Sequence, residues 1–529
     1  MAHPEFIVNR IESGIDEKTN EKIFIEEKIY LPKLGKTEKM AAQEKYKLCK
    51  KNKTIYELTE NIADSLKKHF KFKSIRSEKI QEIWVRINNV YVSCGKSLIQ
   101  QYVRNLLEAL YNSAIVEQVI DKIVVDTFIE SDLFFNTPYK NSIIVENGAL
   151  NLITRELTQD CGEQIHFNRI PVVYDPKATC PAIDKFYADI LEHQIEIDTI
   201  HEINGSCLYK DAFLEKAIMF VGDTRNGKSK CIETIVALLG QKNTSKITLH
   251  RMETDKTSIQ YLFNKLANLV GDISNKELAD NSTFKALVGR ETVASFRKFL
   301  DDIESKPYAK NIFATNQMPA VGDDSGFWTK WVIIKFPYTF VTADLFEEAV
   351  RNAAPEQKKY IKLQDPFIIE KILNAQELSG LLNKALDGLD RVLKNKHFSI
   401  NQSAVDVQKL WTRKSNSFAA FALDCLEHRD NYLVTSSDLN NEYHNYCEHN
   451  GLQYVAGNQI LHKTMLSYFG STSKTIRFDS NVDRYWTGVK FKNEKSVREN
   501  SDRSMFISSP SEIIMEVSSH DTGHQETLR

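Results

Sequence analysis

Long apolar runs are missing from this chain of 529 residues, and its N-terminus has no apolar stretch of the kind that directs secretion. A membrane-spanning helix needs about 20 consecutive apolar residues, so we expect no contact with a membrane. C-x-x-C pairs are also missing among the eight cysteines, which is typical of free thiols in a reducing compartment. These absences predict a soluble cytoplasmic protein.

An excess of charge is absent as well. The 69 lysine and arginine residues are balanced by 71 aspartate and glutamate residues, for a net charge of −2. Any contact with nucleic acid must therefore be confined to a patch or channel. Residues 33–79 are rich in lysine and form either a solvated helical face or a DNA-contacting surface. The length and the ordinary composition predict roughly three or four globular domains.

The most informative segment reads GDTRNGKS, a complete G-x-x-x-x-G-K-S phosphate loop (Walker A). It follows the apolar run Ala217–Val221 and precedes a helical pattern, which is the strand–loop–helix context that the motif requires. In such a loop the backbone N–H groups surround the phosphates, Lys228 reaches the β- and γ-phosphates, and Ser229 offers its hydroxyl to Mg²⁺. We therefore predict a nucleoside triphosphate site made of Gly222, Asp223, Thr224, Arg225, Asn226, Gly227, Lys228 and Ser229.

Polar residues follow two later apolar segments. The run LANLV ends at Asp272, and KNIFAT (Lys310–Thr315) ends at Asn316. With a further strand at Trp331–Phe336, these segments predict a parallel sheet with the acid and the amide at strand ends beside the loop. We expect Asp272 to hold Mg²⁺ and polarise water, and Asn316 to order the attacking water or sense the γ-phosphate.

The order of motifs resembles a known family. GDTRNGKS, LANLVGDIS, FKALVGRETV, KPYAKNIFATNQMP and GFWTKWVIIKFP follow one another as in the helicase superfamily 3 module. The chain is more closely similar to the C-terminal helicase region of phage and plasmid primases and to poxvirus-type primase–helicases. Upstream, VENGALNL, which predicts a β-hairpin around an Asn-Gly turn, and VYDPKATCP resemble the pre-helicase domain of this family. The resemblance covers roughly residues 84–492.

This resemblance implies an AAA+-like ATPase that forms a hexameric ring, hydrolyses ATP with Mg²⁺ at subunit interfaces and pulls single-stranded DNA through its centre, usually 3′ to 5′. It implies a replicative DNA helicase of a virus, provirus or plasmid, located in the host cell if viral. The residues before Trp84 contain no recognisable cluster of metal-binding acids of the kind that primer synthesis requires. We therefore leave open whether a separate primase or polymerase is a partner. The alternative function is an ATP-dependent initiator or regulatory switch that binds DNA without processive unwinding.

Two positions depart from the family pattern. The family often has paired acids in its second motif, whereas Gly271 precedes Asp272 here. Where the family has an arginine finger after Phe-Trp, this chain has Lys330; Arg290 or Arg297 could take that role instead.

Lys285 lies in the FKALVG segment between the motif of Asp272 and that of Asn316. The stretch 297–306 occupies the place of a DNA-gripping hairpin, with Lys298 and Lys306 as candidate contacts; solvated lysines are the alternative.

The C-terminal part predicts a winged helix. Helices are expected at Phe418–His428, Ser437–Asn450 and Asn458–Phe469, followed by two short strands, KTIRF and YWTGVKF. Such a module places one helix in a DNA groove, which nominates His462, Lys463 and Arg477 as contacts with duplex DNA; a protein-binding winged helix is the alternative. Cys425, His428, His444 and Cys447 have metal-like spacing, but the periodicity favours core positions for both cysteines.

These observations together predict an α/β protein with six parts. They are a basic, mainly helical region (residues 1–80), a mainly helical pre-helicase domain with a hairpin (81–195), a P-loop ATPase core (196–345), a helical connector (346–410), a winged helix (411–493) and a disordered tail (494–529).

Overall fold

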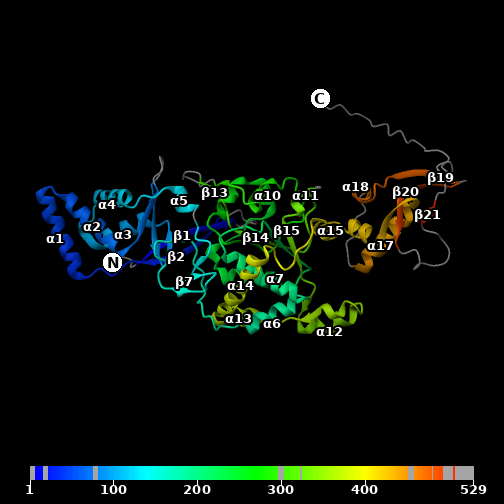
Figure 1. Cartoon of the computed structure of the whole chain (residues 1–529), viewed down its shortest axis with the longest axis horizontal. Coiled ribbons are helices and arrows are strands. Elements are labelled where there is room, and N and C mark those ends of the chain that lie inside the picture. Colours follow the sequence, from blue (N-terminus) through cyan, green and yellow to red (C-terminus); the bar gives the residue numbers. More distant parts are fainter. Residues whose placement is uncertain are drawn as a thin grey trace, which may run out of the picture. The chain divides into compact units, whose positions relative to one another are not determined.

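The computed structural model describes residues 6–15, 22–75, 81–136, 138–295, 303–321, 324–450, 458–478, 481–492 and 504–506. The chain divides into two compact units. Unit 1 comprises Met1–Gln317 and Val321–Ala404, and unit 2 comprises Met318–Ala320 and Val405–Arg529. Figure 1 follows the elements along the chain. Within the described ranges, no helix combines the length and the apolar character that crossing a bilayer requires.

A five-stranded parallel sheet forms the centre of unit 1. Its order is β10-β11-β14-β9-β15. The strands are β9 (Ala217–Val221), β10 (Thr244–Ser245), β11 (Ala267–Val270), β14 (Lys310–Thr315) and β15 (Trp331–Lys335). Nearly every strand residue is buried, as expected for parallel strands covered on both faces. The mixed α/β class and the predicted parallel sheet are thereby confirmed.

The short edge strand β10 was not predicted, because two residues carry no periodic signal. Side-chain hydrogen bonds attach its following residues to the sheet. The amide of Asn268 on β11 accepts from the Ile247 N–H at 2.7 Å and donates to the Ile247 carbonyl at 2.8 Å. It also donates to the Asn311 side chain on β14 at 3.2 Å, so one buried amide connects three adjacent segments.

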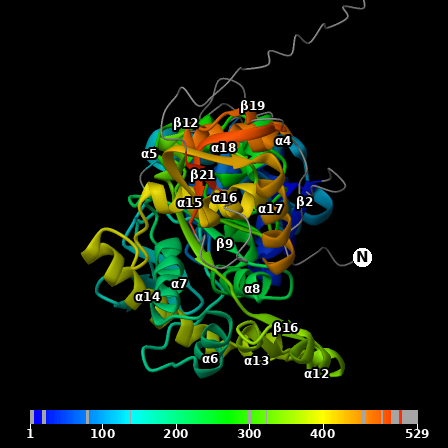
Figure 2. The same cartoon turned by 90° about the vertical axis from the view of Figure 1, so that its right-hand side faces the viewer.

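Helices pack closely beneath this sheet. The core helices are α6 (Pro181–Ile190), α7 (Gln194–Leu208), α8 (Lys228–Leu239) and α14 (Ala375–Asn395). α7 and α14 lie side by side in both Figure 1 and Figure 2. Glycines permit this approach: a Cβ at Gly205 would lie 2.1 Å from the Ala385 carbonyl oxygen, and one at Gly388 would lie 2.4 Å from that of His201. The segment predicted as a helical connector thus supplies part of the main core.

The connector also differs from the prediction in containing a strand. β17 (Ile361–Leu363) pairs in parallel with β16 (Thr339–Val341). Helices α12 (Ala343–Asn352) and α13 (Ile368–Ile372) flank this pair. Three-residue strands are too short for an alternating pattern to be recognised in the sequence.

The N-terminal region contains more strand than the prediction of a mainly helical region allows. A hairpin of β1 (Phe6–Ile15) and β2 (Lys22–Tyr30) precedes α1 (Lys36–Asn52) and α2 (Ile55–His69). Next come β3 (Phe72–Ile75), β4 (Glu82–Ile87), β5 (Val90–Val92), α3 (Gly95–Leu107) and α4 (Ser113–Asp126). The polar sequence NRIESG within β1 hides the strand, because it lacks the apolar alternation of a half-buried strand.

A three-stranded antiparallel sheet follows the short helix α5 (Ser131–Phe135). It consists of β6 (Ser142–Val145), β7 (Gly148–Asn151) and β8 (Leu157–Thr158), and β6 with β7 forms the predicted hairpin. The predicted pair of strands is present, but its turn is Glu146-Asn147, and Gly148 is the first residue of β7, paired with Val145. Gly148 has φ 149°, and a Cβ there would lie 2.3 Å from the Thr158 carbonyl oxygen, so this position requires glycine.

Unit 2 follows the element order α16 (Ser417–Cys425), β18 (Leu426–Thr435), α17 (Ser436–Asn450), α18 (Asn458–Phe469), β19 (Ser473–Phe478) and β20 (Asn481–Phe491), after α15 (Ala404–Ser415). Helix α16 ends at Cys425, three residues before the predicted end at His428. The strand β18 was not predicted, because the charged residues at its centre interrupt the apolar alternation that indicates a strand. In the segment predicted to be disordered, Ser504–Phe506 forms β21, which pairs with β18.

The cysteines with metal-like spacing lie in the hydrophobic core of unit 2. Cys447 is buried beside Tyr443 and Phe421, and Cys425 packs against the same cluster. Among the residues that the structure describes, no group of three or more His, Cys, Asp or Glu side chains gathers as a metal centre. Core packing therefore accounts for both positions.

Candidate functional site

The loop Gly222–Ser229 connects β9 to α8, so it lies at the carboxyl end of a central strand and at the N-terminus of a helix. Two glycines shape it. A Cβ at Gly222 would lie 2.0 Å from Nδ2 of Asn226 and 2.4 Å from the Phe336 carbonyl oxygen. Gly227 has φ 92°, and a Cβ there would lie 2.6 Å from Cγ2 of Ile190. The loop can adopt this conformation against its neighbours only because both residues lack a side chain.

Lys228 is buried at the centre of this loop, with 5% of its surface exposed. Its ammonium donates to the carbonyl oxygens of Gly222 at 2.6 Å and Asp223 at 2.9 Å. It also contacts Oδ1 of Asn226 and Oδ1 of Asn316, both at 3.0 Å. The amide predicted at the end of β14 therefore touches the lysine predicted to bind phosphate, although 88 residues separate them.

Asp272 and Ser229 line the same cavity, which has a volume of about 910 Å³. Asp272 follows β11, Asn316 follows β14 and the loop follows β9, so parallel strands deliver all three to one edge of the sheet. Both Asp272 and Ser229 are exposed. A carboxylate and a hydroxyl are oxygen ligands of the kind that Mg²⁺ takes, so these two residues could hold that ion beside a bound phosphate.

The opposite wall of the cavity comes from segments that sequence reasoning did not assign to the site. Phe186 and Ile190 of α6, Phe340 of β16 and Leu363 of β17 provide its apolar part. The loop is tied to this wall, because the Phe340 N–H donates to the Arg225 carbonyl oxygen at 2.8 Å. The proline and acid in QDPF after β17 mark a turn, but nothing in that pattern indicates a ligand. This cavity joins a cationic, oxygen-rich end to an apolar end, which suits a nucleotide.

Lys330 lies away from this cavity. It immediately precedes β15, whose Trp331 pairs with Ala217 at the start of β9. The loop lies at the other end of β9, five residues or about 17 Å along the strand. The Lys330 ammonium instead forms an ion pair with Glu215 at 2.8 Å.

The other charged candidates also have partners or lie elsewhere. Arg290 forms an ion pair with Asp211 at 3.0 Å, and Lys285 forms one with Asp324 at 2.6 Å. Arg297 and Lys298 lie outside the described residues. Lys306 is exposed and lines a second cavity, described below.

Of the three residues in unit 2 that are predicted to contact DNA, the structure describes the side chain of His462 alone. His462 on α18 is half-buried; its Nε2 lies 3.2 Å from Oγ of Ser473, and its ring packs 4.6 Å from that of Trp486. The side chains of Lys463 and Arg477 lie outside the described part. Arg484 on β20 is exposed and reaches Oγ of Ser473 at 3.0 Å, so it contributes charge to this surface.

Comparison with known proteins gives two family matches. Residues 21–192 match a model described as D5 N terminal like, and residues 220–327 match a family of unknown function, DUF5906. The second range contains the loop, Asp272 and Asn316. Among curated proteins, none matches this chain.

Solved structures with similarity to this chain include three of the NrS-1 C-terminal region. An A form apo structure has 13% identity and a TM-score of 0.42, covering 81% of this chain and 99% of its own. An A form of residues 305–718 has 12% identity and a TM-score of 0.38, and another apo structure of those residues has 13% and 0.36; each covers 81% of this chain and 98% of its own. The N-terminal part of this chain is therefore similar to the D5 N terminal like family.

Proposed function

We propose that this chain is an ATP-driven DNA helicase of the primase–helicase type that acts in the replication of a virus, provirus or plasmid. One observation carries the proposal. The loop lysine, an acid and an amide, which come from three different parallel strands, line one cavity, and the lysine and the amide are in contact at 3.0 Å. This is the set of groups that phosphoryl transfer to water requires.

The residues of the cavity fit ATP and Mg²⁺. When bound, the metal ion and the triphosphate supply a phosphoryl group activated toward attack by water. Lys228 exchanges its contacts with the Gly222 and Asp223 carbonyl oxygens for phosphate oxygens, so its charge is already in place before the nucleotide arrives. Asn316 would then orient water, and Asp272 with Ser229 would hold the metal. The backbone N–H groups at the start of α8 complete the phosphate contacts.

The position of Lys330 supports action as an oligomer. A lysine about 17 Å from the loop along β9 is too far to reach a nucleotide bound in its own chain. If Lys330 is the cationic finger, it therefore acts on the nucleotide of a neighbouring copy. A hexameric ring with sites between subunits meets this requirement.

Two further features support DNA as the substrate. β12 (Val293–Ser295) and β13 (Ile303–Ser305) form an antiparallel pair, and β13 belongs to the stretch 297–306 that the sequence predicts to contact DNA; residues 296–302 lie outside the described part. In unit 2, the order helix, strand, helix, helix, strand, strand is that of a winged helix, which we propose binds duplex DNA or a replication partner.

A strand-displacement assay with 3′- and 5′-tailed duplexes tests the proposal. We expect ATP-dependent displacement from one of the two tails, and none from the variant Lys228→Ala. Displacement without ATP would contradict it. Because only Asp272 stands where paired acids are common, with Gly271 before it, an ATP-dependent DNA-binding switch is the second candidate. A protein whose DNA affinity changes with ATP but which displaces neither strand would be such a switch.

A further inference from the structure

A second cavity, of about 440 Å³, lies at the opposite edge of the sheet from the loop Gly222–Ser229. Three of the segments that line it are separated by one to four residues from the amino ends of parallel strands. Lys210–Ala212 precedes β9, Phe263–Asn264 precedes β11, and Lys306–Tyr308 precedes β14. The remaining wall comes from α5 and the residues after it, and from Arg290 and Thr292 before β12. This cavity is therefore separate from the proposed ATP site.

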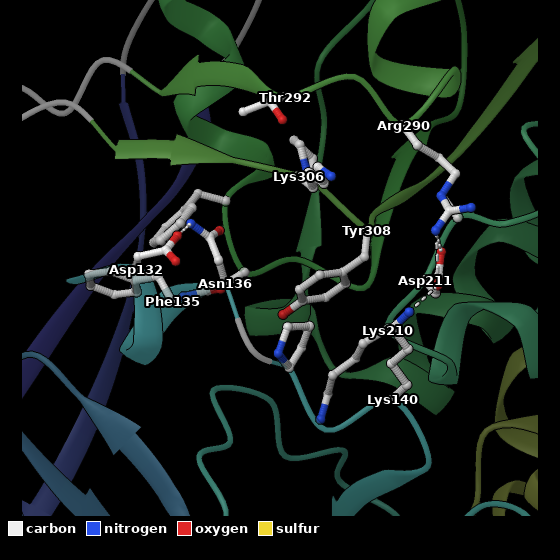
Figure 3. A pocket seen from close by; sticks show the side chains of 15 residues that line it. Asp132, Phe135, Asn136, Lys140, Lys210, Asp211, Arg290, Thr292, Lys306 and Tyr308 are labelled. Carbon is white, nitrogen blue, oxygen red and sulfur yellow. Dashed lines mark hydrogen bonds and ion pairs between the residues drawn. The ribbon is translucent and has the colours of Figure 1, made fainter. Parts of the chain in front are cut away.

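The charges around this cavity favour an anion. Four cationic side chains line it against two carboxylates, an excess of two positive charges when Lys210 is protonated. Asp211 holds two of the cations at the rim: it lies 2.5 Å from the Lys140 ammonium and 3.0 Å from the Arg290 guanidinium. Figure 3 shows Arg290 and Asp211 on one side, with Lys306 between them and the group of Asp132, Phe135 and Asn136. Lys306 is exposed, and it forms no ion pair with another residue in the described part of the chain.

Lys210 has a different role from the other three cations. Its ammonium is buried, donates to the Ser142 carbonyl oxygen at 2.9 Å and lies 3.0 Å from Nδ1 of His166. Burial lowers the pKa of Lys210 to about 7, and burial together with the Lys210 charge lowers the pKa of His166 to about 2. Because the Lys210 ammonium donates its hydrogen bonds to protein atoms, this residue stabilises the wall of the cavity. The cations that can contact a ligand are therefore Lys140, Arg290 and Lys306.

The other side of the cavity is aromatic. Phe135, Phe263 and Tyr308 line it, and the rings of Phe135 and Phe263 pack edge to face at 5.2 Å. Phe263 is only half-buried, and Tyr308 is anchored by a 2.9 Å hydrogen bond from its hydroxyl to Asn168. Cations beside aromatic rings form the arrangement that binds the phosphates and bases of single-stranded nucleic acid. The volume suits one nucleotide and excludes a duplex.

We propose that this second cavity binds a single nucleotide unit, with its phosphate at Lys140, Arg290 and Lys306 and its base against Phe263 and Tyr308. The unit belongs either to a DNA strand or to a free nucleotide. The strand source rests on the proposed function, because a strand that crosses β12 and β13 passes the rim where Lys306 lies. The cavity itself does not depend on it.

Binding in the absence of ATP tests this inference. The variant Lys228→Ala of the 529-residue chain serves as the background, so that the loop Gly222–Ser229 contributes nothing. Fluorescence anisotropy with a labelled oligothymidylate is measured over a range of salt, with thymidine monophosphate and inorganic phosphate as competitors. Into this background we introduce the pair Arg290→Ala and Lys306→Ala, or Phe263→Leu, and as a matched control Lys394→Ala, an exposed lysine on α14.

Loss of two phosphate contacts should lower the salt slope of oligothymidylate binding by about 1.4, at roughly 0.7 per contact on a single strand. Phe263→Leu should weaken binding by roughly fivefold or more at every salt concentration, because a stacking surface is lost. Lys394→Ala should bind as the background does. Thermal unfolding of each variant checks that the fold is kept.

The competitors identify the source of the nucleotide. If the variants weaken oligothymidylate binding and the monophosphate does not compete, the ligand is a strand. If the monophosphate binds and only its binding is lost in the variants, the ligand is a free nucleotide. If both probes bind the variants as tightly as the control, or if inorganic phosphate alone binds, the inference is wrong. Strand displacement with ATP is a separate measurement. If the protein displaced no strand, the binding measurements described here would still show whether the second cavity binds a nucleotide unit.

Discussion

Replacing Lys228 with alanine is the most informative perturbation, because the structure predicts two separable effects. In the free protein, the Lys228 ammonium satisfies the carbonyl oxygens of Gly222 and Asp223 and the amide oxygens of Asn226 and Asn316. Gly222 and Asn226 are buried, so their oxygens lose a donor that water cannot easily replace. An acceptor left in this state costs about 1 to 3 kcal/mol, which is the destabilisation that we expect for unit 1.

The second effect concerns the ligand. At an ATP concentration of about 100 times the dissociation constant, binding should raise the free energy of unfolding of the wild-type protein by about 2.7 kcal/mol. The variant should gain little or none of this, because the only buried cation of the loop is gone. ATP hydrolysis should fall by a factor of about 100 or more, since the charge that develops on the phosphoryl group is no longer stabilised.

Chemical unfolding with and without ATP and Mg²⁺, together with phosphate release, measures both effects. Lys394→Ala is the control and should behave as the wild type does in each. A variant that is less stable but still gains 2.7 kcal/mol from ATP would mean that Lys228 only supports the loop. A variant that hydrolyses ATP at the normal rate would refute the assignment of the site.

Three further predictions follow from single positions. Lys330→Ala removes an ion pair with Glu215, which should lower the free energy of unfolding by at most about 1 kcal/mol. ATP turnover by the assembled protein should nevertheless fall about a thousandfold if Lys330 is the cationic finger that reaches the nucleotide of a neighbouring copy. Full turnover in this variant would show that Lys330 does not have that role. Gly271→Asp should change the free energy of unfolding by no more than about 0.5 kcal/mol, because the new Cβ would have no non-neighbouring atom within 4 Å. The added carboxylate should lower the Mg²⁺ concentration at which ATP hydrolysis is half-maximal. An unchanged Mg²⁺ titration would show that position 271 does not reach the metal. Because burial lowers the pKa of His166 from 6.5 to about 2, only the unfolded chain binds its proton between these values, and stability should fall by about 1.4 kcal/mol per pH unit as the pH drops below 6.5. Denaturant titrations of His166→Gln across that range should lack this slope, and a slope equal to that of the wild type would argue against a neutral His166.

The strand–loop–helix around Lys228 was predictable because its determinants are local. Two glycines, a lysine and a serine at fixed spacing stand between an apolar run and a helical pattern, and the structure has β9 and α8 at these positions. Asp272 and Asn316 could be placed near the loop for a related reason. Each follows a buried strand, and parallel strands bring their carboxyl ends to one edge.

The rest of the site could not be predicted in this way. Phe186 and Leu363 face the same cavity although they are far apart in the sequence, and β17, which carries Leu363, has only three residues. The contact between Lys210 and His166 is likewise formed by folding alone. A lysine and a histidine at those positions carry no sequence signal of burial, because residues of both types are usually exposed or half-exposed.

The sequence by itself determined four of the five strands of the parallel sheet, the loop between β9 and α8, and the two polar residues at the neighbouring strand ends. Backbone hydrogen bonding and hydrophobic periodicity act over a few residues, so these features can be recognised in a short stretch of chain. Only the tertiary structure decided which segments close the cavity over the loop, that Lys330 lies at the far edge of the sheet, and that Lys140, Arg290 and Lys306 gather beside aromatic rings. These relations depend on how distant segments pack, and an alternation of apolar and polar residues specifies which face of an element is buried but not what is buried against it.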